Sequence, residues 1–240
     1  MNQGNEIPFR ARVSRALWLL IDGVIPPRCA GCEQAGIRWC EDCQRETDNL
    51  PEYCCDLCGK PGNMDGRCFY CSHERPNYAA ARSGGVFENG VRNALHRLKY
   101  KGDISLGEAL SAHLEKRVRA EAWPLDVVVP VPLGPKRYKT RGYNQAAILA
   151  EPLAWRLNLP YLPKSIQRIR ETRSQIDLTR EERKQNVAGA FQADRNLAAA
   201  KNILLVDDVM TTGATLNSAA QALLLAGAEA VYAVTFGRAR

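Results

Sequence analysis

The 240-residue sequence lacks the signatures of several large protein classes. It contains no apolar run long enough to cross a lipid bilayer and no low-complexity tract. It has no Walker phosphate loop and no Rossmann fingerprint, and its three histidines are too scattered to suggest a serine–histidine–aspartate set. These absences argue against a membrane-spanning or disordered chain and against the common nucleotide-binding and hydrolase motifs.

A basic and then apolar stretch near the N-terminus has only the outline of a secretion signal. Three arginines precede the apolar residues 16–25, but Asp22 interrupts the stretch, and two prolines follow where a cleavage site would need small residues. Residues 1–28 are therefore expected to form an N-terminal extension without membrane insertion, in a cytoplasmic protein. The apolar residues fall at helical spacing and predict a short amphipathic helix that packs on the domain behind it. They are Leu17, Leu20, Ile21, Val24 and Ile25.

Cysteine is confined to residues 29–71, where eight of the nine cysteines form four Cys-x-x-Cys pairs. Two such pairs supply the four thiolates of a closed tetrahedral zinc site, which has no open position for chemistry. Residues 29–76 are therefore predicted to be a small zinc-binding unit in which the metal supplies folding energy. The predicted ligands are Cys29, Cys32, Cys40, Cys43, Cys55, Cys58, Cys68 and Cys71.

The spacing leaves the metal count and the pairing open. Two zinc ions bound by consecutive sets are the simplest arrangement, but interleaved pairs or one occupied site also fit the pattern. A disulfide framework is the main alternative, although no convincing export signal precedes these cysteines. Cys54 is expected to be a bystander thiol, and His73 a surface histidine.

After residue 76 the pattern becomes one of alternating strands and helices. Continuous apolar strands that alternate with helices predict a parallel sheet covered on both faces. Residues 77–240 are therefore expected to form one α/β domain. Strands are expected at 81–87, 125–131, 202–207 and 230–236. Helices are expected at 89–101, 104–122, 143–157 (broken or offset by Pro152), 179–186 and 214–226.

Residues 203–226 combine a buried strand, two acids, a small polar loop and a helix. Asp207 and Asp208 end the apolar strand, and residues 211–215 form the loop. Ligands of such sheets bind beyond the carboxyl ends of the strands, and a helix N-terminus there suits a phosphate. Gly213 allows the backbone to approach that phosphate closely. A 5-phosphorylated ribose with free hydroxyls satisfies both the loop and the acids, unless the acids merely cap the helix.

The loop, with its two acids, resembles the phosphoribosyl pyrophosphate (PRPP) motif of type I phosphoribosyltransferases. The resemblance implies that the acids hold the ribose hydroxyls, that the loop takes the 5-phosphate, and that Mg²⁺ rides on the pyrophosphate. It makes Asp207 and Asp208 the catalytic candidates. The implied PRPP-binding residues are Asp207, Asp208, Met210, Thr211, Thr212, Gly213, Ala214 and Thr215.

Further motifs make the resemblance more specific. They are residues 129–133, 141–145, 180–191 and 95–100, together with the four cysteine pairs. In this order they resemble the ComF family, whose members include ComFC-type competence proteins and GntX-like proteins. The resemblance spans residues 24–238 and implies a role in DNA uptake or in use of external DNA, binding of single-stranded DNA, and contacts with competence or DNA-processing proteins. Cys54 and the long N-terminus depart from the family pattern.

Positive charge is concentrated beside this motif. Residues 133–184 hold twelve lysines and arginines and five acids, which accounts for the whole net charge of +7. A loop after Val131 is expected to reach the crevice, where its cations suit pyrophosphate or a nucleic-acid backbone. A solvated basic surface, a plain helix end at Lys99 and a helix cap at Asn144 are the alternatives. The candidates are Lys99, Lys136, Arg137, Arg141 and Asn144.

Three functions remain compatible with these features. The first is a phosphoribosyltransferase, a pentosyl-transferring glycosyltransferase whose acceptor the sequence does not identify. The second is a DNA-binding accessory protein in which PRPP is sensed and not consumed. The third is a regulator with a vestigial pocket.

Overall fold

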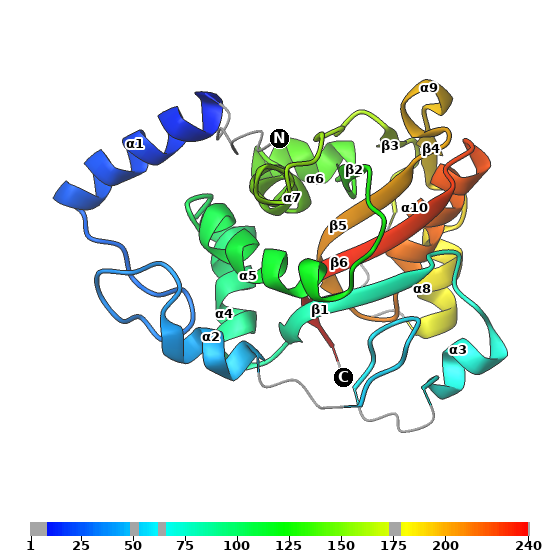
Figure 1. The fold of residues 1–240 in the computed structure, drawn as a ribbon, viewed down its shortest axis with the longest axis horizontal. Helices are drawn as coiled ribbons and strands as arrows, with labels where there is room; N and C mark the ends of the chain where they lie inside the picture. Colours follow the sequence, from blue (N-terminus) through cyan, green and yellow to red (C-terminus); the bar gives the residue numbers. More distant parts are fainter. Residues whose placement is uncertain (1–8, 49–52, 62–65, 173–178, 240) are drawn as a thin grey trace, which may run out of the picture.

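A four-stranded parallel sheet lies at the centre of the protein (Figure 1). The structure is a computed structural model that describes the backbone of residues 9–48, 53–61, 66–172 and 179–239, and the side chains of these residues from 16 onward. The strand order is β1–β6–β5–β2. The strands are β1 (Ala80–Val86), β2 (Val127–Pro130), β5 (Asn202–Met210) and β6 (Ala230–Arg238). The predicted parallel α/β fold is confirmed.

Helices cover both faces of the sheet because its central strands are apolar on both sides. Leu204 and Val206 of β5 pack on one face, whereas Ile203 and Leu205 pack on the other. The first face is covered by α4 (Asn89–Tyr100), α5 (Leu106–Ala120) and α7 (Gln145–Leu157), and the second by α10 (Ala214–Leu225). The alternation of side chains along a strand thus divides the protein into two hydrophobic cores.

A small antiparallel pair of strands extends the α10 side of the molecule. It consists of β3 (Ile166–Arg168) and β4 (Phe191–Ala193), and α9 (Arg195–Ala198) follows it. Between the two strands, α8 (Arg180–Val187) starts at a capping box formed by Thr179 and Glu182, as the sequence predicts.

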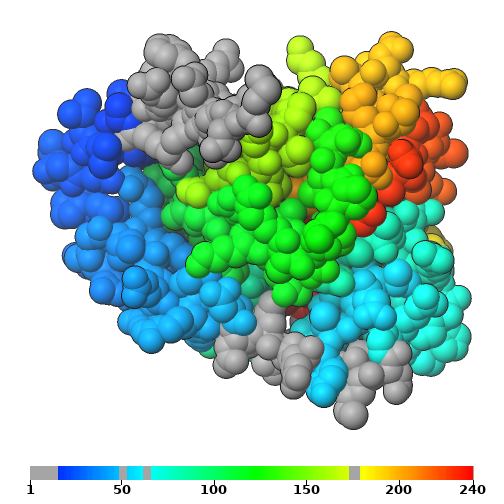
Figure 2. Space-filling model, viewed as in Figure 1, coloured from blue at the N-terminus to red at the C-terminus, as the bar shows by residue number. Residues whose placement is uncertain are grey.

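The two cysteine clusters belong to different cores. The first, with α2 (Glu41–Asp48), packs with α4, whereas the second, with α3 (Phe69–His73), packs on the α10 side. Figure 2 shows the blue atoms of residues 29–48 and the cyan atoms of residues 66–80 on opposite sides of the visible face. The two cysteine clusters therefore pack on opposite faces of the sheet.

The N-terminal helix α1 (Phe9–Val24) contradicts one prediction. It is a helix, but its apolar side chains do not pack on the domain: Leu20 is 72% exposed and Val24 is 82% exposed. Leu17, Ile21 and Ile25 are exposed as well. The helix is instead attached to the first cysteine loop by polar contacts, with Arg38 paired to Asp22 at 2.6 Å. No helix in the described part of the chain is long and apolar enough to span a membrane.

Three local details also differ from the sequence-based expectation. The basic segment after β2 is not a loop but the short helix α6 (Pro135–Arg141), which starts at a proline and ends at Gly142 in a left-handed conformation. Helix α7 continues through Pro152, because its buried leucines hold it on the sheet. Strand β5 runs to Met210, so both acids lie within the strand.

Candidate functional site

Asp207 and Asp208 lie near the carboxyl end of β5, where a parallel sheet offers its ligand crevice. The backbone N–H of Asp208 donates to Asp207 Oδ1 at 2.8 Å, so the Asp207 carboxylate is held against the backbone of the strand. Burial, followed by the neighbouring charge of Asp208, raises the pKa of Asp207 to about 7. Burial and the neighbouring carboxylate therefore favour the protonated form of Asp207.

Lys99, at the end of α4, reaches these acids. Its Nζ lies 2.8 Å from Oδ2 of Asp208. Burial alone would lower the pKa of Lys99, but the carboxylates of Asp208 and Asp207 outweigh it and raise the pKa. The sequence left open whether Lys99 is a plain helix end, and the structure places it in the crevice as a cation.

The loop after β5, residues 211–213, leads directly into α10 through a glycine in a left-handed conformation. Gly213 takes a left-handed φ of 81° and precedes α10, whose first backbone N–H, at Ala214, points to the hydroxyl of Thr212 at 3.3 Å. A Cβ on Gly213 would lie 2.7 Å from Cε of Met210. Met210 itself is buried beneath the loop, so it supports the loop from below. The 12-residue helix α10 thus begins directly after this loop, which places its N-terminal backbone N–H groups there.

A cavity of about 640 Å³, the first cavity, adjoins the acids. Eight of the predicted site residues line it: Lys99, Arg137, Arg141, Asn144, Asp207, Asp208, Thr211 and Thr215. Lys136 lies outside it, beside a neighbouring hollow that Arg137 and Arg141 also line. Met210 does not line it either.

Asn144 is occupied by structural contacts. Its side-chain oxygen accepts from the backbone N–H of Ala146 at 3.1 Å and caps α7, and its amide nitrogen donates to the carbonyl of Val131 at 2.9 Å. The cap that the sequence offered as an alternative is therefore present. It ties the start of α7 to the end of β2 at the rim of the first cavity.

Three arginines of this cavity were not among the site candidates: Arg183, which lies in the motif at residues 180–191, and two that no motif marks. Arg168 at the end of β3 and Arg92 on α4 both line it. Burial, and then the charge of Arg137, lowers the pKa of Arg168, whereas Asp207 raises it. No local motif marks either residue, since β3 is too short to give a periodic signal; only the basic composition of residues 133–184 points to Arg168.

A second cavity of about 590 Å³ lies on the other side of residues 211–215, the predicted phosphate loop. Its walls are the second cysteine cluster, α8 and the loop residues Thr212, Gly213 and Ala214. The two cavities share Phe87, Arg183 and Thr211. The predicted PRPP-binding residues are thus divided between two adjoining cavities, with the loop between them.

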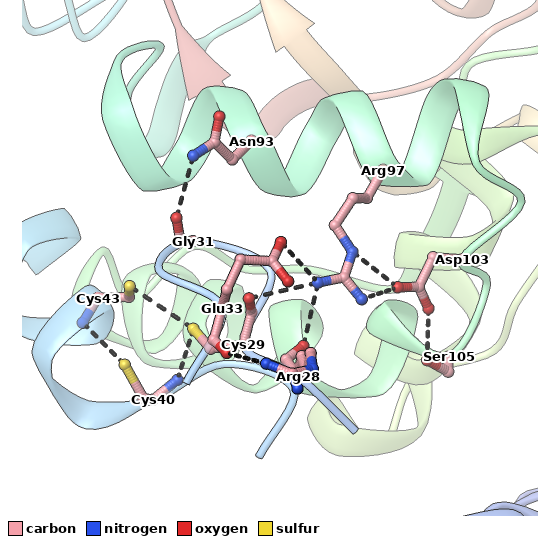
Figure 3. Close-up of polar contacts among 10 residues, drawn as sticks. All are labelled: Arg28, Cys29, Gly31, Glu33, Cys40, Cys43, Asn93, Arg97, Asp103 and Ser105. Carbon is pink, nitrogen blue, oxygen red and sulfur yellow. Dashed lines mark hydrogen bonds and ion pairs between the residues drawn. The ribbon is translucent and has the colours of Figure 1, made fainter. Parts of the chain in front are cut away.

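The first cysteine cluster consists of Cys29, Cys32, Cys40 and Cys43. Arg97 of α4 fixes it to the domain: its guanidinium donates to the carbonyls of Arg28 and Cys29, and pairs with Asp103 at 2.5 Å (Figure 3). Asn93 of the same helix donates to the carbonyl of Gly31 at 3.0 Å. The helix that carries Lys99 is therefore anchored on this cluster.

The second cluster consists of Cys55, Cys58, Cys68 and Cys71, all buried. Arg238, at the end of β6 and only 6% exposed, donates to Sγ of Cys58 at 3.4 Å. Its neighbour Ala239 donates from its backbone to the carbonyl of Met210 at 2.9 Å. The cluster is thereby linked to the strand end that precedes the phosphate loop.

Both clusters fit zinc. Within each, the four sulfur atoms lie within 4.8 Å of one another, and the sulfur–sulfur contacts of 3.5–3.7 Å are close to the edge of about 3.8 Å that Zn–S bonds of about 2.3 Å would give a tetrahedron. These contacts are too long for disulfides, and all nine cysteines are free. The pairs are consecutive and not interleaved. Cys54 belongs to neither cluster, and His73 is exposed, as expected.

Known protein domains match both parts of the chain. A family described as a phosphoribosyl transferase domain matches residues 139–240, and one described as a double zinc ribbon domain matches residues 20–72. The protein is therefore a double zinc ribbon protein with a phosphoribosyltransferase-type α/β domain, in which zinc is a structural cofactor.

Relatives of similar length define the family. Competence protein F of Haemophilus influenzae is 30% identical over 213 residues, which cover 83% of this chain and 90% of the relative. DNA utilization protein YhgH of Salmonella typhi is 33% identical over 74% of this chain and 80% of its own. A glutamine PRPP amidotransferase from B. subtilis, solved with ADP and GMP, is similar over 66% of this chain and 29% of its own, at 22% identity and a TM-score of 0.36. The chain belongs to the ComF family of competence and DNA-utilisation proteins.

Proposed function

We propose that this protein binds PRPP with Mg²⁺ in the first cavity and acts in the cytoplasm on incoming single-stranded DNA, in natural competence or in the use of external DNA. The observation that carries the proposal is the juxtaposition of Asp207 and Asp208 with a glycine-containing phosphate loop in a cation-lined cavity. Competence or DNA-processing proteins are its expected partners.

Each part of PRPP has a matching part of the site. The loop and the N-terminus of α10 hold the 5-phosphate, and Asp207 and Asp208 accept hydrogen bonds from the ribose hydroxyls. Arg137 and Arg141 hold the pyrophosphate, with Lys99 and Lys136 within the same basic region. Mg²⁺ on the pyrophosphate would offset its charge, and the acids beside it offer the oxygen donors that this ion prefers.

The same arrangement suits pentosyl transfer. The bond from ribose C1 to pyrophosphate breaks as a bond to the acceptor forms, and the electron pair of the broken bond leaves with pyrophosphate. Positive charge develops on the ribose, where the carboxylates of Asp207 and Asp208 stabilise it. In this proposal residues 1–28 form an extension, residues 29–76 the zinc-binding part, and residues 77–240 the transferase domain.

Calorimetric titration of PRPP with Mg²⁺ tests the ligand. We expect wild type to bind and the Asp207→Asn/Asp208→Asn double variant to lose binding at least about tenfold, because a neutral amide pairs less well with ribose hydroxyls and leaves Lys99 without its counter-ion. Asp126→Asn is the matched control, since this aspartate pairs with Asn202 at the opposite end of β5. No PRPP binding to folded, zinc-loaded wild type would refute the proposal.

A non-catalytic DNA-binding or regulatory protein with a PRPP-sensing pocket is the second candidate. The Lys99–Asp208 pair motivates it, because a ligand that took the place of Lys99 at Asp208 would release the end of α4 from this contact. Incubation with PRPP, Mg²⁺ and single-stranded DNA separates the two candidates. Release of pyrophosphate supports transfer, whereas binding without release supports sensing.

A further inference from the structure

The second cavity has features that PRPP binding does not use. It extends from the phosphate loop to the second zinc cluster, and Cys58, Cys68 and Cys71 form part of its wall. It meets the first cavity at Thr211. A ligand in it would therefore lie directly beside PRPP without occupying the acid pair.

Its lining is strongly cationic. Six lysines and arginines face two glutamates: Lys60, Arg75, Arg180, Arg183, Lys184 and Arg238 against Glu74 and Glu181. Arg238 is more than nine-tenths buried, and no described residue provides a hydrogen-bond partner for its Nε or Nη1. One nitrogen of Arg238 already faces the Cys58 thiolate, and its two unused donors favour a further hydrogen-bond acceptor at this wall.

Aromatic rings interleave with these cations. Arg180 lies 3.8 Å from the ring centroid of Tyr70, and Lys60 lies 5.5 Å from the same centroid. Tyr70 is 41% exposed, and next to it Phe69 is 70% exposed, with the two rings edge to face at 5.6 Å. Exposed rings bordered by arginine and lysine are the stacking platforms of single-stranded nucleic-acid sites.

We propose that the second cavity, with the adjoining surface of Phe69 and Tyr70, is a binding site for single-stranded nucleic acid. An unpaired base stacks on Tyr70 in place of the Arg180 guanidinium, and the backbone phosphates take Arg180 from Tyr70 and Lys184 from its ion pair with Glu74. A duplex is excluded because its bases are not free to stack on side chains. This inference adds detail to the proposed function and rests on it in one respect. The cations of α6 are taken to bind pyrophosphate, so the nucleic acid is placed beside the second zinc cluster.

Fluorescence anisotropy of a labelled oligothymidylate, without PRPP, tests this binding site. Tyr70→Ala is expected to weaken binding about tenfold, the effect of losing one base–aromatic stack. Tyr138→Ala is the matched control, because Tyr138 is also an exposed tyrosine (52%) and lies among the cations of α6. Unchanged binding by Tyr70→Ala together with weaker binding by Tyr138→Ala would overturn the assignment, as would the absence of binding by wild type at low salt.

Charge reversal at Arg180 gives a second test that replaces no residue of the zinc-binding part, although Arg180 contacts Tyr70. Arg180→Glu should weaken oligothymidylate binding and make the slope of log K against log salt less steep by about 0.7 for each phosphate that the variant no longer neutralises. An unchanged slope and affinity would contradict the proposal even if Tyr70→Ala loses its zinc. Both variants should retain the PRPP heat of wild type. A wild type that binds oligothymidylate but not PRPP would refute the proposed function, whereas the proposed nucleic-acid site would still be supported.

Discussion

The two zinc clusters share one ligand pattern but have different surroundings. The first lies under α4 and is fixed there by Arg97, in a core that includes Leu95 and Leu98. The second lies on the opposite face of the sheet, where its cysteines line a cavity beside the phosphate loop. The two zinc clusters, although alike in sequence, therefore support different parts of the candidate ligand-binding site.

The difference shows how each cluster can affect ligand binding. The first acts at a distance, because it anchors the helix that presents Lys99 to Asp208. The second acts at short range through Arg238, whose backbone is paired with Met210 at the ends of β6 and β5. Loss of either metal should destabilise the protein, but the two losses should affect different ligands.

Removal of one metal at a time should have the largest effect. We expect Cys29→Ser/Cys32→Ser and Cys55→Ser/Cys58→Ser each to lose one zinc by native mass spectrometry and to lower the midpoint of thermal unfolding by about 10 °C or more, because a structural zinc supplies folding free energy directly. Only the second variant should lose oligothymidylate binding. Equal loss of that binding in both variants would contradict the distinction drawn between the clusters.

Gly213→Ala should weaken PRPP binding by at least about tenfold. An alanine in this left-handed conformation costs about 1–2 kcal/mol, and its Cβ would meet Met210 beneath the loop. Gly189→Ala is the matched control, since Gly189 also has a left-handed φ, of 64°, with no atom within 4 Å of the new Cβ. Calorimetry should show normal PRPP binding for Gly189→Ala. Equal weakening by both variants would show that lost stability, and not loop shape, is responsible.

Arg97→Met should separate the first cluster from α4. The variant keeps much of the side-chain volume but loses the bonds to the carbonyls of Arg28 and Cys29 and leaves Asp103 without its arginine. A loss of about 1–3 kcal/mol in the free energy of unfolding is expected from urea titration. Oligothymidylate affinity should stay at the wild-type value, and a parallel fall would argue that the two clusters are coupled.

The smallest expected effect concerns Asp207 and pH. Because the pKa of Asp207 is raised to about 7 in the folded protein from an ordinary value of 3.8, the folded state loses stability as pH rises from about 4 to 7. Asp207→Asn removes this loss, so its midpoint of thermal unfolding, relative to that of wild type, should be higher at pH 8 than at pH 4. A difference that does not change with pH would contradict the raised pKa.

Much of the fold follows from short-range patterns in the sequence. The apolar runs that became β2 and β5 predict a parallel sheet, and Thr179 with Glu182 predicts the start of α8, because these signals depend only on neighbouring residues. The phosphate loop and the cysteine pairs are likewise local motifs. The roles assigned to the PRPP-site residues stay predictions that the proposed experiments address.

Other features depend on residues far apart in the chain and were not predicted. The helical period of α1 is correct, but nothing in it reveals whether another surface covers its apolar side, and the structure leaves that side exposed. The contacts of Arg238 with Cys58 and of Lys99 with Asp208 each join segments separated by 100 residues or more. Pairs of this kind arise only from the arrangement of strands, which a single sequence does not display.

The strand order has a consequence for the time course of folding. Strand β1, which follows the zinc-binding residues, pairs with β6, and the hydrogen-bonded hydroxyls of Ser83 and Thr235 join positions 152 residues apart. Each zinc cluster needs only a span of about 15 residues, so metal can load while the chain is still being synthesised. The sheet must wait until β6 emerges. A nascent chain would therefore carry two zinc-bound clusters for most of its synthesis, before the hydrophobic core against which each one packs has formed.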